Sequence, residues 1–346
     1  MARVSEAKQI EQDNEQAALA SFQLALEALP DPRRRQGMRY PLQTVVVSAL
    51  LGMICGADDA EALEYFGEAN SDWLATFLSL PHGAPTQDVF LHVFAALDPA
   101  AFSAMFRAWA DLITVRLRAS GKHIAIDGKT SRRSFDGERP AIHTVSAWLC
   151  GAGLVLGQQK TRDKSNEITA IPELLRTLNL KGATVTIDAA GTQTEIAKTI
   201  VEGGGHYVLA VKDNQPTLRS DLERLFAEVA DERRRSVDEL ARPRVEVFEE
   251  SDKGHGRVET RKVSLSRDLD WLTTRENWSG LQVALKVERE RTIMSTGECT
   301  TQTMYYIGSD ATLNAKRAAK LVRRHWSIET ELHWVLDMAF DEDQAR

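Results

Sequence analysis

The sequence predicts an α/β protein in which a mixed sheet is flanked by helices, with a helical N-terminal region and a mainly β insertion. Apolar side chains recur at helical spacing through residues 15–118, which indicates packed helices. After residue 121, short runs rich in isoleucine and valine alternate with amphipathic helical stretches, a pattern typical of a mixed sheet covered by helices. Between about residues 214 and 310 this alternation stops and extended stretches take its place.

The N-terminal region is predicted to be helical because its apolar runs have helical spacing and stop at proline or glycine. Pro30 ends the first run, and Gly56 ends the second, which is apolar enough to form a buried helix. The predicted helices are 15–29, 43–57, 61–78 and 99–117.

Three consecutive strands are predicted next, followed by a helix, a strand, a helix and a strand. The three runs are "HIAID", "IHTVSAWLC" and "GLVLGQQK", separated by polar or glycine-containing segments. The later elements are helix 165–178, strand 183–188, helix 192–204 and strand 206–212.

The insertion begins with an amphipathic helix, 218–234, and continues with extended stretches. A long helix or helix pair then spans 312–339, and Ser309 or Asp310 could cap it. The predicted strands of the insertion are 243–250, 256–266, 281–291 and 301–308. The predicted domains are a helical N-terminal domain at 1–118, the first part of the sheet domain at 119–213, the insertion at 214–311 and the last helix of the sheet domain at 312–346.

Composition limits the class of protein. The 346 residues suffice for about two domains. The net charge of −7 taken alone disfavours a nucleic-acid partner, but cations cluster locally, for example at Lys316–Arg324, so DNA binding stays open. Three distant cysteines without a C-x-x-C pair indicate a reducing compartment and argue against structural zinc. The polar N-terminus and a longest apolar run of 13 residues, 45–57, predict a soluble cytoplasmic protein without a membrane span.

Two aspartates follow apolar strands in the same way. Asp127 ends "IAID" and Asp188 ends "TVTID". If these strands are neighbours, both carboxylates project from one edge of the sheet, where they repel each other unless a cation lies between them. Mg²⁺ suits such a place because it takes oxygen ligands and leaves positions open for phosphate oxygens.

A third carboxylate, Glu329, lies on the predicted C-terminal helix. His325 and His333 are four residues to either side of it and therefore share its helical face. Each of these residues also has an ordinary explanation. Aspartates at strand ends usually form turns or caps, and a lone helical glutamate is usually solvated. The histidines are more often structural than ligands, so spacing alone leaves the metal site open.

Several long blocks, in the same order, resemble those of bacterial insertion-sequence transposases, closest to the H-repeat-associated branch of the DDE transposases. These blocks are "DPRRRQGMRYPL", "IAIDGKTSRRS", "DKSNEITAIPELLRTLNLKGATVTIDAAGTQ", "HYVLAVKDNQPTL", "HGRVETR" and "RRHWSIETELHWVLDMAFDED". The resemblance extends from about Leu29 to the last residue.

The resemblance implies a ribonuclease-H-like mixed sheet whose catalytic and metal-binding carboxylates are Asp127, Asp188 and Glu329. It implies two Mg²⁺ ions, for which Mn²⁺ is expected to substitute, and hydrolysis at a transposon end followed by attack of the freed 3′-hydroxyl on target DNA. The expected enzyme is thus a polynucleotidyl transferase and endonuclease. The helical N-terminal region is expected to contribute to DNA binding or assembly.

The partner implied by the resemblance is double-stranded DNA, both transposon ends and target, bound by a homodimer that is nucleoid-associated when on DNA. The residues expected to hold DNA are Lys129, Lys212, Asn214, Gln215, Arg323, Arg324 and His325, with His255 and Arg257 in the insertion. Two alternatives remain. One is a truncated, catalytically inactive DNA-binding remnant, because relatives continue past the "FDED" region. The other is a nuclease that cuts DNA without joining it.

Overall fold

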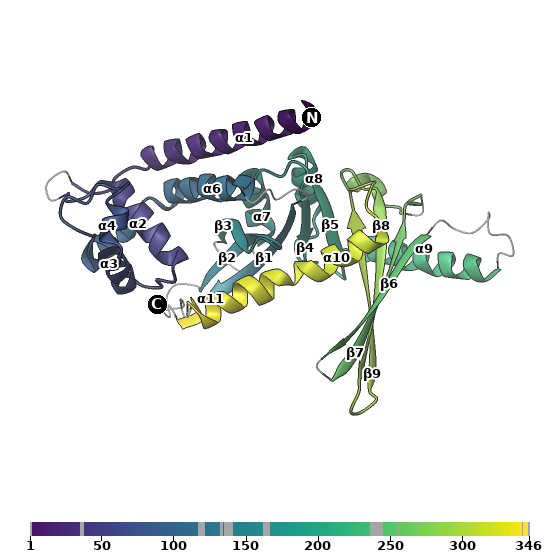
Figure 1. The fold of residues 1–346 in the computed structure, drawn as a ribbon. Helices are drawn as coiled ribbons and strands as arrows, with labels where there is room; N and C mark the ends of the chain where they lie inside the picture. Colours follow the sequence, from purple (N-terminus) through teal and green to yellow (C-terminus); the bar gives the residue numbers. More distant parts are fainter. Residues whose placement is uncertain are drawn as a thin grey trace. The chain divides into compact units, whose positions relative to one another are not determined.

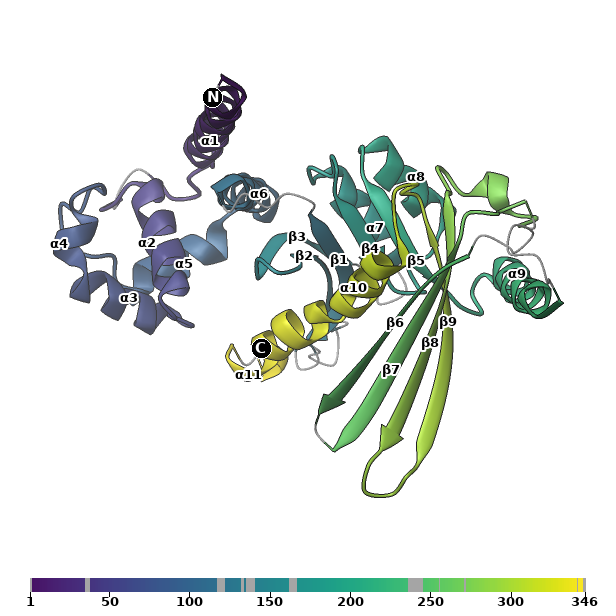
Figure 2. The ribbon, with the colours of Figure 1, turned by 45° about the vertical axis from the view of Figure 1, so that its right-hand side comes forward.

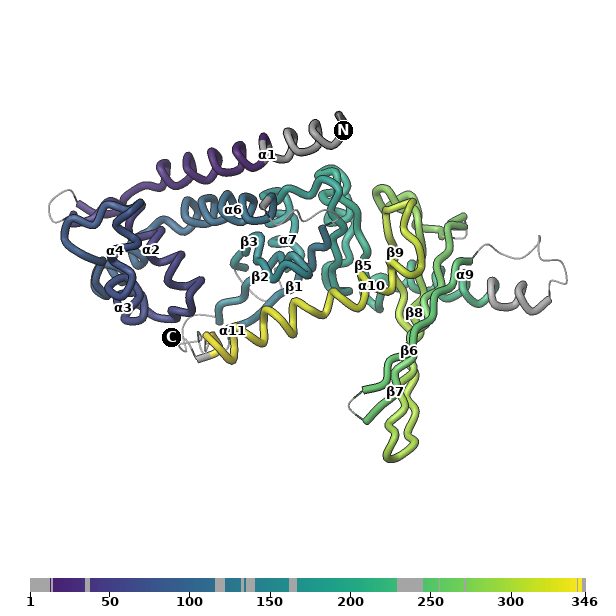
Figure 3. Tube along the Cα trace, in the orientation of Figure 1, coloured from purple at the N-terminus to yellow at the C-terminus, as the bar shows by residue number. Residues whose placement is uncertain are grey.

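The protein divides into two compact units, Met1–Arg118 and Ala119–Arg346, each with its own core. The computed structural model describes residues 2–34, 38–116, 122–131, 134, 141–161, 167–235, 245–254, 256–270, 272–340 and 342–344 (Figures 1 and 3). His255, one of the residues expected to hold DNA, lies outside these ranges.

The first unit is helical, as its apolar spacing predicts. Its helices are α1 (Ala2–Glu27), α2 (Leu42–Ile54), α3 (Ala60–Ala69), α4 (Ser71–Leu74), α5 (Gln87–Ala96) and α6 (Pro99–Arg116). Their apolar faces meet in a core that includes Val45, Phe90 and Met105, all of which are fully buried. Across the described residues, no single helix is long and apolar enough to cross a membrane. Helices α5 and α6 meet both criteria only when taken together, and the pair is bent by 107°.

The second unit holds one sheet and its covering helices. Its strands are β1 (His123–Ser131), β2 (Ile142–Leu149), β3 (Leu154–Thr161), β4 (Thr184–Ile187), β5 (His206–Val211), β6 (Val245–Gly254), β7 (Arg257–Ser266), β8 (Val283–Ile293) and β9 (Cys299–Gly308). Its α-helices are α7 (Glu167–Arg176), α8 (Thr194–Glu202), α9 (Pro216–Arg235), α10 (Ala315–His325) and α11 (Trp334–Met338). Two short 3₁₀ turns cover Arg275–Asn277 and Glu342–Gln344, and a π-helix spans Ile328–His333.

The sheet is mixed, as predicted, and its strand order is β3-β2-β1-β4-β5-β9-β8-β7-β6. The central strands β1, β4 and β5 are parallel, and the remaining neighbours are antiparallel. The strands of the insertion therefore join the main sheet, because β9 pairs with β5. Figure 2 shows β6–β9 as long strands that extend beyond the helices.

Strand β1 does not end at Asp127, as its sequence suggests, but continues to Ser131. Its parallel pairing with β4 stops at Ile126, opposite Ile187, while its antiparallel pairing with β2 continues along the remaining residues. Asp127 and Asp188 thus come directly after the last paired residues of two neighbouring strands. The expectation that both lie at one edge of the β1–β4 pair is confirmed, although β1 itself runs on.

The C-terminal helical segment begins later than predicted. Asn314, rather than Ser309 or Asp310, caps α10 by accepting a hydrogen bond from the Arg317 N–H. Asp310 instead accepts hydrogen bonds from Thr312 and pairs with Arg317. The apolar face of α10 packs on β7–β9 in a buried cluster that includes Leu285 and Leu321. The π-helix and α11 follow after a break at Trp326.

Candidate active site

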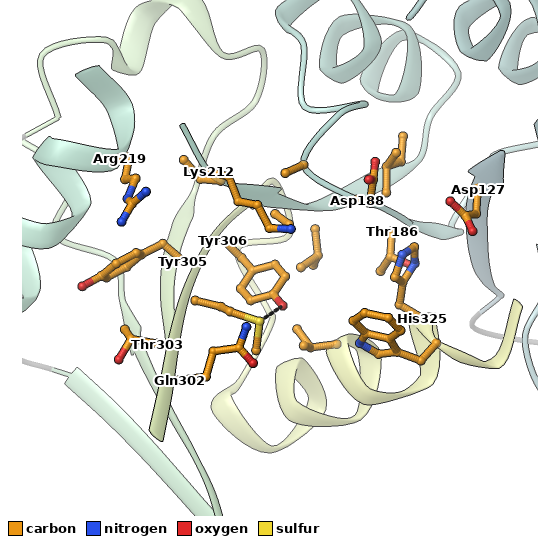
Figure 4. Close-up of a pocket in the computed structure, with 18 of the residues that line it drawn as sticks. Asp127, Thr186, Asp188, Lys212, Arg219, Gln302, Thr303, Tyr305, Tyr306 and His325 are labelled. Carbon is orange, nitrogen blue, oxygen red and sulfur yellow. Dashed lines mark hydrogen bonds between the residues drawn. The ribbon is translucent and has the colours of Figure 1, made fainter. Parts of the chain in front are cut away.

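One cavity in the second unit brings the three predicted carboxylates together. Its volume is about 270 Å³, and Asp127, Asp188 and Glu329 all line it. Figure 4 shows Asp127, Asp188, Thr186 and His325 at one end of this cavity and Lys212, Arg219 and Tyr305 toward the other. The carboxylates come from three separate elements, namely β1, the loop after β4 and the π-helix.

Asp127 is held in a partly buried position where its negative charge is unfavourable. Burial raises the pKa of Asp127 to about 7, and the negative charges of Asp188, Glu329 and Glu167 contribute to the rise. The hydrogen bond from the Gly128 N–H acts in the opposite direction. A carboxylate in this environment takes up a proton near neutral pH unless a cation balances it.

Asp188 lies in a tight loop that several hydrogen bonds fix. The Gly191 N–H donates to Asp188 Oδ1 over 3.2 Å, and a Cβ at Gly191 would stand 2.3 Å from the Ile187 side chain, so only glycine fits here. Asn214 donates to the Ala189 carbonyl and Gln215 to the Thr192 carbonyl, at 2.6 and 3.0 Å. Asn214 and Gln215, predicted to hold DNA, therefore position the loop that carries Asp188.

Glu329 is positioned by the buried residues beside it. Ile328 and Leu332 pack against Ala125 of β1 and Trp148 of β2, and the Trp148 indole N–H donates to Ser327 Oγ over 3.2 Å. The sequence suggests an ordinary helix here, whereas Glu329 lies in a π-helix. π-Helical turns are wider than α-helical turns, so the direction of Glu329 does not follow the α-helical spacing of α10. Such turns occur often at functional sites.

His325 is neutral and belongs to a buried chain of hydrogen bonds. Its Nδ1 lies 3.0 Å from Thr186 Oγ1, which in turn lies 2.8 Å from His123 Nε2. Burial lowers the pKa of His325 to about 4, against the opposing effect of Asp188. Burial, with the nearby His325 and Arg324, lowers the pKa of His123 to about 3. His325 lines the cavity as a neutral imidazole, and its expected contact with DNA stays a prediction.

His333 approaches Asp127 from the other end of the π-helix. Its Nδ1 lies 3.6 Å from Asp127 Oδ2, and its buried Nε2 has no hydrogen-bond partner among the described residues. Burial, assisted by the Lys129 charge, lowers the pKa of His333 to about 4. His333 is therefore a neutral neighbour of Asp127 at physiological pH.

Lys129 does not present a free cation. Three carboxylates of the C-terminal segment surround its ammonium group: Asp337 at 2.5 Å, Glu342 at 2.9 Å and Asp343 at 3.5 Å. The sequence predicts that Lys129 holds DNA, whereas in the structure these three carboxylates already balance the charge of Lys129. Partners more than 200 residues away along the chain could not be inferred from its local sequence.

The remaining cations expected to hold DNA lie in different places. Lys212 is exposed and lines the cavity. Arg323 pairs with Asp252 at 2.7 Å and Glu250 at 3.6 Å, both on β6. Arg324 lies against Gly151, since a Cβ at that glycine would stand 2.8 Å from its guanidinium.

Other residues of the cavity were not singled out from the sequence. Thr186 alternates with the apolar residues of β4, and that alternation could have indicated a polar position at the site. Tyr305, Tyr306 and Arg219 give no such local signal, because their places depend on the pairing of β9 with β5 and on α9. Burial raises the pKa of Tyr306 to about 12, so this hydroxyl stays protonated.

The three carboxylates are ligands of the type that suits a hard divalent cation. Carboxylate oxygens are the ligands that Mg²⁺ prefers, and a cation beside Asp127 would offset the burial and the neighbouring negative charges that raise its pKa. Over the described ranges, no three carboxylate, imidazole or thiol side chains are close enough together to enclose one ion. The residues thus fit the metal by chemistry and by sharing one cavity, while their side chains do not form a closed coordination shell.

Comparisons with known proteins identify the family of the chain. The family model described as "Transposase DDE domain" matches residues 118–346, and the model described as "DDE_Tnp_1-associated" matches residues 24–110. The chain is 40% identical to "Uncharacterized protein in dhlA 3'region" of Xanthobacter autotrophicus over 79% of this chain and 90% of the relative.

Two relatives in Escherichia coli carry transposase names. The chain is 37% identical to "Putative transposase YncI" of strain O157:H7 over 93% of this chain and 80% of the relative. It is 35% identical to "H repeat-associated putative transposase YhhI" of strain K12, over 93% of this chain and 83% of the relative. The resemblance seen in the sequence blocks is confirmed: the chain belongs to the DDE transposase family, in its H-repeat-associated branch.

Proposed function

We propose that this protein is an active DNA transposase that hydrolyses a strand at transposon ends. The freed 3′-hydroxyl would then attack a phosphodiester of the target DNA, joining the strands and releasing the 3′-hydroxyl of the target. The protein's core would be ribonuclease-H-like, and its substrate would be double-stranded DNA bound by a homodimer in the cytoplasm, at the nucleoid. The observation that carries this proposal is the meeting of Asp127, Asp188 and Glu329 in one cavity of a chain from the DDE transposase family.

The three carboxylates would hold Mg²⁺, or Mn²⁺ in its place. When bound, a pair of such ions would stabilise the charge on phosphate oxygens and lower the pKa of the attacking hydroxyl. Asp127 is the ligand that would gain most, because a bound cation would favour the ionised carboxylate that burial and the neighbouring negative charges disfavour. The fixed Asp188 loop and the packed π-helix would keep the other two carboxylates in place.

Other side chains of the cavity would act on the DNA itself. Lys212 is exposed at the cavity wall and would contact a phosphate beside the one that reacts. His325, neutral and held by Thr186, would offer its imidazole as a fixed hydrogen-bonding group. This role needs no proton exchange with solvent, which its burial disfavours.

The test is strand cleavage and joining on a duplex made from the DNA that flanks the gene. We expect wild-type protein to nick and join this duplex in Mg²⁺ or Mn²⁺ and to do neither in EDTA. Asp127→Asn, Asp188→Asn and Glu329→Gln should each reduce both products by at least about 100-fold. Glu331→Gln is the matched control, since Glu331 is an exposed residue of the same π-helix that does not line the cavity. Cleavage that persists in the Asp188 or Glu329 variant would overturn the site assignment.

The alternative function is an inactive DNA-binding protein. It is favoured by the spacing of the carboxylates, which form no closed metal shell among the described residues. It predicts DNA binding that depends on salt, with no product in any divalent metal. A nuclease that cannot join DNA would give nicked product alone, so the joining assay distinguishes all three cases.

A further inference from the structure

A second cavity, of about 540 Å³, lies beside the active-site cavity and is lined by arginines. It is bounded by α10 and by the face of β7–β9 against which α10 packs. We call it the arginine groove after the five guanidinium groups that line it: Arg257, Arg261, Arg289, Arg291 and Arg323. The proposed function uses none of its strand arginines.

The arginines share one face because of strand alternation and register. Arg257, Glu259 and Arg261 alternate along β7, and Arg289 and Arg291 alternate along β8. Register places Arg261 directly opposite Arg289, while Glu259 lies opposite Arg291. Like charges directly opposite each other destabilise a sheet. Glu259 and Glu250 offset the charge of Arg261, whereas Arg289 has no carboxylate partner among the described residues.

The carboxylates near the groove leave part of this charge unbalanced. Glu259 is buried and pairs with Arg261 and, at 4.0 Å, with Arg291. Arg323 pairs with Glu250 and Asp252 at the β6 edge. Within the described part of the chain, Arg257 and Arg289 have no carboxylate partner, and Arg289 donates only to the Gln302 side chain at 2.9 Å. Five guanidinium groups thus face three carboxylates, which leaves an excess of positive charge.

The groove adjoins the active-site cavity. Met304, Val322 and Trp326 line both, so the two spaces share one wall. Trp326 is 51% exposed, although it is large and apolar. It lies three residues before Glu329, at the end of α10. An exposed aromatic ring between a cationic groove and a carboxylate cavity is suited to stacking on a nucleic-acid base.

We infer that the arginine groove binds the phosphates of the DNA strand that leads into the carboxylate cavity, with Trp326 stacked on a base at the junction. Guanidinium groups match phosphate oxygens in a bidentate geometry, and among the described residues no carboxylate competes for Arg257 or Arg289. A bound phosphate would also relieve the repulsion between Arg261 and Arg289. The inference rests on the proposed function, because it takes DNA as the substrate of the neighbouring cavity.

The experiment measures binding apart from catalysis. Anisotropy of a short fluorescein-labelled duplex in EDTA, titrated with KCl, gives the affinity and its salt slope. The double variant Arg257→Gln/Arg289→Gln should bind at least about tenfold more weakly and lower the slope by about two. Arg176→Gln/Arg275→Gln is the matched control, because it removes the same charge from exposed arginines outside both cavities. Its affinity should change less than about twofold.

Two further variants, both at Arg289, separate a binding role from a folding role. Arg289→Lys keeps the charge and should restore the salt slope. Arg289→Gln should unfold at a temperature no lower than wild type, because it removes the repulsion with Arg261.

Trp326→Ala should weaken binding several-fold, while Trp326→Phe should keep most of it, because either aromatic ring can stack. Trp334→Ala, at another exposed tryptophan that lines neither cavity, is its control.

The outcomes distinguish this inference from the proposed function. Equal losses of DNA affinity in the groove variant and its arginine control, or unchanged affinity in both, would overturn the inference that the arginine groove binds DNA. Neither result would bear on cleavage and joining. Preference of the groove for an acidic peptide over DNA would also overturn it. Absence of cleavage by wild type, with the groove variant still defective in binding, would overturn the proposed function and leave the groove supported.

Discussion

Asp127 combines two properties that rarely persist together without a reason. It lies at the point where β1 loses its β4 partner, and its carboxylate is partly buried beside other negative charges. A position like this costs stability whenever the carboxylate is ionised. Cation binding would offset that cost, which is why the free protein should report on the metal site even without DNA.

Removing the Asp127 charge should stabilise the free protein. Asp127→Asn keeps the shape of the side chain and removes the unfavourable ionised form, so in EDTA at pH 8 we expect a gain on the order of 1–2 kcal/mol. Mg²⁺ should stabilise wild type and leave the variant unchanged. Urea unfolding with and without Mg²⁺ measures both effects. A variant less stable than wild type in EDTA would show that the ionised carboxylate is well accommodated.

His123 should make stability fall on acidification. Its pKa of about 3 in the folded protein lies below its ordinary value, so the unfolded chain binds a proton that the folded protein excludes. Stability should therefore decrease as the pH falls from about 6.5 toward 3, with a slope from this residue of up to about 1.4 kcal/mol per pH unit. His123→Gln should make that slope shallower in urea unfolding between pH 6.5 and 4.5. His82→Gln, at an exposed histidine, is the control, and an equal change in both would contradict the assignment.

Local sequence identified residues whose role depends on their own strand or helix, and it failed where the partner is distant. Asp127 and Asp188 could be singled out because each follows an apolar strand. The enclosure of Lys129 by Asp337 and Glu342 had no local signal, because it depends on how the chain's end packs on β1. Asn214 was expected near DNA, but its amide is used to hold the Ala189 carbonyl.

The π-helix is the element on which the site depends most. Ile328 and Leu332 anchor it to β1 and β2, and Glu329 is carried between them. The sequence predicted a helical segment here but not its π-helical turn, because apolar spacing does not reveal which carbonyl each N–H will reach. The late start of α10 has a similar cause, since Asp310 is used for Arg317 and the cap falls to Asn314.

Weakening the packing of Ile328 should reduce strand cleavage more than an equally destabilising substitution elsewhere does. Ile328→Ala removes a fully buried side chain and should cost about 2–5 kcal/mol. Ile200→Ala, at a fully buried position of α8, is matched in chemistry and burial and does not touch the cavity. At a temperature where both variants are folded by circular dichroism, only Ile328→Ala should lose most strand cleavage. Similar cleavage by the two variants would mean that Glu329 does not depend on this packing.

At the scale of the whole molecule, the chain carries two separate cores. The first unit has its own buried cluster around Phe90, and the second is built on the sheet. Alternation and spacing predicted the helices of the first and the mixed sheet of the second. The pairing of β9 with β5, which joins the insertion to that sheet, could not be predicted, because it connects residues far apart in the chain.

Separate cores predict separate unfolding. Phe90→Ala should lower one calorimetric transition, since removal of a buried phenylalanine costs about 3–5 kcal/mol, and leave the other in place. Ile200→Ala should lower the other transition alone. A single transition that both variants shift equally would show that the two units unfold as one.

The central claim is that Asp127, Asp188 and Glu329 together bind divalent metal. Anomalous X-ray diffraction from crystals of the protein with Mn²⁺ and DNA tests it most directly. We predict Mn²⁺ peaks in the active-site cavity, in contact with oxygens from all three side chains. Mn²⁺ bound elsewhere, with Glu329 turned away from the two aspartates, would contradict the account.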